Sequence, residues 1–96
     1  MSEKIEIENI NVPGKVSRVE KTKYEEIKRC LMSVLPEQAP GLSHSQIVEA
    51  CKSEASDTLF PNGEKLGWWT KTVQLDLEAK SALKRHTGKP LSWYKA

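Results

Sequence analysis

The sequence predicts one α+β domain in which three helices lie between an N-terminal and a C-terminal β-hairpin. Segments rich in β-branched or aromatic residues stand near both ends of the chain, as strands require. Three segments between them carry apolar residues at helical spacing. The connections contain proline and glycine, which end helices and form turns. A length of 96 residues suffices for one domain with one core.

The N-terminal hairpin is predicted over residues 1–20. Its first strand contains the alternating segment "KIEIE", and "VPGK" at residues 12–15 places proline and glycine at the centre of a type II turn. The alternation of apolar residues changes phase after Glu8. We therefore expect a bulge or bend close to this residue.

The first helix is predicted over residues 22–35. Thr22 and Glu25 have the spacing of a capping box, in which each side chain bonds the backbone of the other residue. Glu25, Glu26 and Arg29 fall on a face that we expect to be solvated. The opposite, apolar face contains Tyr24, Ile27, Cys30, Leu31, Val34 and Leu35.

The second helix is predicted over residues 44–55. Ser43 and Gln46 form a second capping box. Leu59 and Phe60 in the following connection are expected to fold back onto the core. The apolar side of the helix contains Ile47, Val48, Ala50, Cys51 and Ala55. The two cysteines have no partner spacing typical of zinc, so small buried thiols are the favoured interpretation, with a disulfide or a reactive thiol as alternatives.

The third helix is predicted over residues 65–82, and the C-terminal hairpin over residues 83–95. At 100° per residue, the apolar side chains of the third helix cover an arc of about 220°, which predicts a central helix packed on two sides. Trp68 and Trp69 fall within this arc, so both are expected in the core. The polar strip opposite consists of Thr70, Lys71, Gln74, Glu78 and Ser81.

Charge is unevenly distributed. Residues 1–64 contain eight basic and eleven acidic residues, a net charge of −3. Residues 65–96 contain seven basic and two acidic residues, a net charge of +5. A basic segment can attract phosphate, or it can be an ordinary solvated surface. Asp76 and Lys80 are four residues apart, which favours a surface ion pair on the third helix.

Three short helices closed by a hairpin are the arrangement of a winged helix-turn-helix domain. The segment "GWWTKTVQLDLEAKSALKRHTGKPLSWYK" resembles the recognition helix and wing of such domains, and is similar to the N-terminal domain of Mrr-type restriction proteins. The whole chain also resembles a family of small bacterial proteins of unknown function. Ser81 stands where the winged-helix pattern usually has the glycine that ends the helix, so a longer helix is expected.

Catalysis finds little support in the sequence. Ser43, His44 and Ser45 adjoin at a helix start, where capping explains them, and His86 has no evident carboxylate partner. The motifs of phosphate-binding loops, serine hydrolases, zinc proteases and dinucleotide-binding domains are lacking. We expect a cytoplasmic protein that is not an enzyme, with no cofactor, no metal and no membrane segment.

Two functional hypotheses remain. The first is binding of double-stranded DNA, with the third helix in the major groove and the basic wing on phosphates. The second is a winged helix used for protein contact, as a homodimer or accessory subunit. For DNA, the base-reading residues would be Thr70, Lys71 and Gln74, and the phosphate-contacting residues would be Lys65, Lys84, Arg85 and Lys89.

Overall fold

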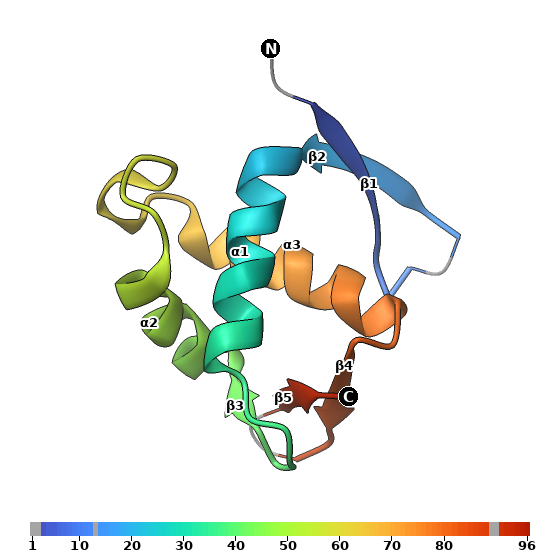
Figure 1. Cartoon of the computed structure of the whole chain (residues 1–96). Helices are drawn as coiled ribbons and strands as arrows, with labels where there is room; N and C mark the ends of the chain where they lie inside the picture. Colours follow the sequence, from blue (N-terminus) through green and yellow to red (C-terminus); the bar gives the residue numbers. More distant parts are fainter. Residues whose placement is uncertain (1–2, 13, 89–90) are drawn as a thin grey trace.

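The structure, a computed structural model, describes residues 3–12, 14–88 and 91–96. It confirms the α+β class, with three helices and two antiparallel sheets. In chain order the elements are β1 (Lys4–Glu8), β2 (Val16–Glu20), α1 (Lys21–Val34), β3 (Leu42–Ser43), α2 (His44–Glu54), the 3₁₀ turn η1 (Pro61–Gly63), α3 (Leu66–Ala79), β4 (Leu83–His86) and β5 (Ser92–Lys95). Figure 1 shows the β1–β2 hairpin and the small sheet at different sides of the helices.

The two sheets have different topologies. Strands β1 and β2 form an antiparallel hairpin in which Lys4 faces Glu20 and Glu8 faces Val16. The register stays regular to Glu8, so the expected bulge is absent from the described part of the hairpin, and the change of phase marks the end of β1. The predicted type II turn includes Pro13, which lies outside the described residues. The second sheet has the order β3-β5-β4, and its short first strand was not predicted.

The helix starts confirm one capping prediction and contradict the other. At α2, the Ser43 hydroxyl accepts from the Gln46 backbone N–H at 3.3 Å, and the Gln46 side chain accepts from the Ser43 backbone N–H at 3.0 Å. At α1, the helix already begins at Lys21, with Glu20 at the N-cap and no side-chain cap. Thr22 is therefore inside the first turn, where it cannot take the capping position.

Helix α3 is the central element, as its wide apolar arc predicted. It contacts α1, α2, β1 and β4, and Figure 1 shows it running from the η1 side of the molecule to the hairpin. Five consecutive residues, 73–77, are buried, which requires neighbours on several sides of the helix. Phe60 also lies in the core, with Leu59 packed against it, as predicted.

The end of α3 differs from its predicted boundary. The helix ends at Ala79, and Ser81 adopts a left-handed conformation with φ of 63°. The backbone N–H of Ala82 donates to the Leu77 carbonyl at 2.8 Å, the long bond that closes a helix after a left-handed residue. Serine thus occupies the position that usually requires glycine, and the expectation of a longer helix is wrong.

Asp76 links three parts of the fold from inside α3. Its carboxylate is fully buried and accepts from the Glu8 backbone N–H of β1 at 2.8 Å and from the Tyr24 hydroxyl of α1. The Lys80 ammonium lies 3.0 Å from the carboxylate. Burial raises the pKa of Tyr24, and the bond to Asp76 raises it further. Asp76 and Lys80 do pair, but the expected surface position of Asp76 is wrong.

Replacing Asp76 with alanine should destabilise the domain by about 3 kcal/mol, because it leaves a partly buried N–H, a buried hydroxyl and an ammonium without their shared acceptor. Urea unfolding at pH 7 measures the change. Glu25→Gln, a substitution at an exposed acid of α1, is the control and should change stability by less than about 0.5 kcal/mol. Equal effects of the two substitutions would contradict the anchoring role of Asp76.

Candidate functional site

The predicted base-reading strip is not on the surface. Thr70 is fully buried, and Gln74 is 1% exposed. The Thr70 hydroxyl donates to the Gly67 carbonyl of the same helix at 3.0 Å. Gln74 lies among side chains of α2, β4 and β5. The expectation that both residues face outward is therefore wrong, and neither can reach a base edge in this fold.

The two adjacent tryptophans have opposite environments. Trp69 is 7% exposed and packs edge-to-face on Phe60, with ring centroids 6.0 Å apart, so its core position is confirmed. Trp68 is 57% exposed, the largest exposed fraction among the large hydrophobic residues described. Its only aromatic neighbour among the described residues is Trp69, at 5.2 Å between centroids. The prediction that Trp68 lies in the core is wrong.

Trp68 and Lys71 form the open side of α3. On a helical wheel they lie about 60° apart, whereas Thr70 is about 100° from Lys71. Both side chains line a cleft of about 480 Å³ between α3 and the β1–β2 hairpin. The hairpin contributes two cations, Lys15 and Arg18, and one carboxylate, Glu8. Besides Trp68, the apolar side chains that line the cleft are Ile7, Val12 and Val19 from the hairpin and Leu75 from α3. The cleft thus combines an exposed indole with an excess of positive charge.

The remaining predicted phosphate contacts are scattered. Lys65 and Lys84 are exposed, on the residue before α3 and on β4 respectively. Arg85 is engaged within the fold: its guanidinium donates to Glu78 at 3.0 Å and lies over the Trp93 ring. Lys89 lies outside the described residues. Of the predicted residues that the structure describes, only Lys71 lines the cleft, while the sequence analysis missed Lys15 and Arg18.

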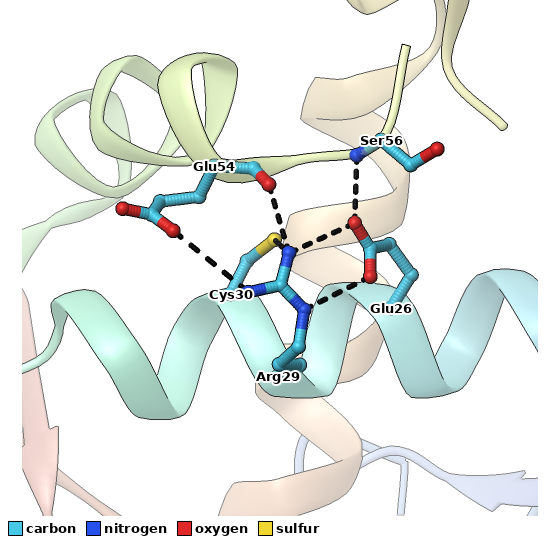
Figure 2. A network of polar contacts seen from close by, with 5 residues as sticks. All are labelled: Glu26, Arg29, Cys30, Glu54 and Ser56. Atoms are coloured by element: carbon cyan, nitrogen blue, oxygen red, sulfur yellow. Dashed lines mark hydrogen bonds and ion pairs between the residues drawn. The ribbon is translucent and has the colours of Figure 1, made fainter. Parts of the chain in front are cut away.

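A second polar cluster joins α1 to the end of α2 (Figure 2). The Glu26 carboxylate accepts from the Ser56 backbone N–H at 2.6 Å and from Arg29 at 3.0 Å. Arg29 also donates to the Glu54 carbonyl at 2.8 Å, at the end of α2. Glu26 is only 15% exposed, so its expected solvated position is wrong. Each member satisfies backbone groups or another member, which identifies the cluster as structural.

The Arg29 hydrogen bond lowers the pKa of Glu26, and this predicts a pH-dependent stability. The carboxylate form stabilises the fold above its ordinary pKa of 4.5, and the contribution disappears as the pH falls through the lowered folded value. Glu26→Gln should therefore destabilise by about 1 kcal/mol at pH 7, and this loss should shrink steadily as the pH is lowered below 4.5. Urea unfolding at a series of pH values measures the loss, and a loss that stays constant below pH 4.5 would contradict the prediction.

The two thiols show no sign of reactivity. Cys30 and Cys51 are free and fully buried, as predicted. Burial raises the pKa of both and brings that of Cys51 to about 12, so the thiolate is scarce at neutral pH. Within residues 3–12, 14–88 and 91–96, no group of three potential metal ligands is present. No helix among these residues is long and apolar enough to cross a membrane.

Fold and surface together define a small α+β domain built on a central helix, with a cationic, tryptophan-containing cleft beside it. The chain belongs to a family of unknown function (DUF6958), whose model matches residues 4–93. This agrees with the resemblance to small uncharacterised proteins. No curated protein was found to match the chain, and no solved structure was found to match it.

Proposed function

We propose that this domain is a winged-helix protein that binds DNA through the cleft between α3 and the β1–β2 hairpin. The element order α1–β3–α2–α3–β4–β5, with the sheet order β3-β5-β4, supports the winged-helix assignment. The observation that carries the function is the exposed Trp68 beside Lys71, with Lys15 and Arg18 across the cleft. Indole rings stack on bases, and cations along a groove follow the phosphate backbone.

The burial of Thr70 and Gln74 changes the expected mode of binding. Without these readers, α3 offers few hydrogen-bonding groups to base edges, so recognition would depend little on sequence. Base stacking on Trp68 requires a base face, which unpaired nucleotides expose and an intact duplex hides. Single-stranded DNA is therefore the favoured form of ligand, and duplex DNA would bind more weakly through phosphates alone.

Fluorescence anisotropy with a labelled single-stranded 20-mer and its duplex tests the proposal. Three phosphate contacts, from Lys15, Arg18 and Lys71, give an expected slope of about −2 for log affinity against log salt. Trp68→Ala should lower affinity for the single strand by roughly tenfold or more, with little loss of stability, because the indole is exposed. Lys71→Ala should make the slope shallower by about 0.7.

Lys28→Ala is the matched control, since Lys28 is an exposed cation of α1 that does not line the cleft. Lys28→Ala should bind the single strand as tightly as the wild type does. Adding Trp68→Ala to this variant should lower its affinity by the same factor as in the wild type. Absence of binding to either oligonucleotide at micromolar protein and low salt would overturn the proposal. Equal losses for Lys28→Ala and Lys71→Ala would show that the attraction is not localised in the cleft.

Protein contact is a second candidate function, favoured by the exposed apolar residues of the hairpin. The exposed fractions of Ile10, Val12 and Val16 are 38%, 45% and 54%. Val12 lines the cleft, and the other two residues are near it in sequence. Exposed apolar side chains that gather on one part of a surface often mark an interface. If two copies associate through it, Val16→Glu should convert a dimer into a monomer in light scattering. A wild-type protein that is monomeric at high micromolar concentration would exclude the homodimer.

A further inference from the structure

The cleft between α3 and the β1–β2 hairpin is small for a nucleic-acid site. Its volume of about 480 Å³ lies within the range of about 300–1,000 Å³ that is usual for sites holding one small ligand. Domains that bind a single strand along its length cover about 4–16 nucleotides. A cleft of this size therefore suits one nucleotide, with its base, sugar and phosphate.

The cationic groups that line the cleft are open to solvent and unpaired. Lys15, Arg18 and Lys71 are all exposed. None of them is in an ion pair within the part of the chain that the structure describes. Arg29, by contrast, is an exposed cation that pairs with the carboxylates of Glu26 and Glu54. The cleft thus gathers cations whose charge the fold itself does not use.

The charge of the cleft matches one class of phosphate group. Three cations and one carboxylate, Glu8, line it, which leaves a net charge of +2. A phosphate inside a strand is a diester with one negative charge, whereas a terminal phosphate is a monoester with a charge of about −1.5 to −2 at pH 7. One nucleotide in the cleft therefore balances this charge only when its phosphate is a monoester.

The same cleft offers the other contacts that a nucleotide requires. The Arg18 guanidinium can hold two phosphate oxygens at once. The hydroxyls of Ser17 and Thr72, each next in sequence to a cation, also line the cleft and can donate to phosphate oxygens. Trp68 is 57% exposed, and its edge-to-face contact with Trp69 covers at most one face of its ring. The other face can stack on a base.

We infer that the cleft binds a nucleotide that carries a phosphomonoester, with the base on Trp68 and the phosphate between Arg18 and Lys71. In a DNA strand this group occurs only at a phosphorylated end, so the domain prefers strand ends to the interior of a strand. A free mononucleotide carries the same groups and is the other source of this chemistry. The inference rests on the proposed function, because it uses the same cleft and the same stacking residue.

Isothermal titration calorimetry with a thymidine 8-mer tests the inference. The oligonucleotide is compared with a phosphate at its 5′ end, with a phosphate at its 3′ end, and with hydroxyls at both ends. One phosphorylated form should bind roughly tenfold or more tightly than the hydroxyl form, because its phosphate accepts charge-assisted hydrogen bonds. A 24-mer with the same phosphate should also bind one protein at the tight site, because a strand of any length has only one such end.

Two variants separate the phosphate contact from base stacking. Arg18→Ala should remove most of the preference for the phosphorylated form, whereas Trp68→Ala should weaken the binding of both forms by a similar factor. Both side chains are exposed, so the melting temperatures of the two variants should match that of the wild type. Lys28→Ala, outside the cleft, should keep the preference intact.

Three results would overturn the inference and leave DNA binding in place. They are equal affinity for the phosphorylated and hydroxyl forms, a number of tight sites that grows with strand length, and an unchanged preference in Arg18→Ala. Failure of every strand and of thymidine 5′-monophosphate to bind would overturn the proposed function as well. The mononucleotide also separates the two sources of the phosphate: affinity equal to that of the phosphorylated strand would assign the cleft to a free nucleotide, and weaker affinity would assign it to a strand end.

Discussion

The buried carboxylate of Asp76 is the interaction on which the arrangement of the domain depends. It is presented by the central helix, and it joins that helix to the backbone of β1 and to the hydroxyl of Tyr24 on α1. A buried carboxylate is stable only when its oxygens are hydrogen-bonded or paired, so the β1 backbone, the Tyr24 hydroxyl and the Lys80 ammonium must be in place together. The position of the N-terminal hairpin is therefore coupled to the packing of α1 on α3.

Anchoring the hairpin at Asp76 decides which side of α3 meets solvent. The hairpin flanks one side of the helix, while α2 and the β4–β5 strands cover the side that carries Thr70 and Gln74. What remains open is the sector of Trp68 and Lys71, which borders the cleft. The exposed indole and the cationic cleft beside it thus both follow from the position in which the hairpin docks.

Local patterns predicted much of the fold. The helical spacing of apolar residues located three helices, the Ser43 capping box located the start of α2, and the wide apolar arc identified α3 as central. These features depend on residues within one or two turns of each other. The two-residue strand β3 was missed because its pairing with Trp93 and Ser92 leaves almost no trace in a segment so short.

The candidate site was harder to predict, because burial of polar residues depends on distant partners. Asp76 and Gln74 are polar, and a wheel assigns such residues to the surface unless a partner is known. The partners of Asp76 on α1 and β1 are 52 and 68 residues away in sequence. An arc of about 220° also does not reveal which of its edges is covered. Trp68 was therefore predicted to be buried, and the open sector was predicted on the side of Thr70 instead of the side of Trp68.

The 68-residue separation between Glu8 and Asp76 also bears on biosynthesis. A ribosome delivers the β1–β2 hairpin first and the helix that anchors it much later. A two-stranded hairpin is marginally stable in water by itself. Its apolar face, which includes Ile7 and Val19, must therefore wait for α3 to emerge from the exit tunnel. Closure of this 68-residue loop is a late step of folding, because the helices between its ends can form first from local contacts.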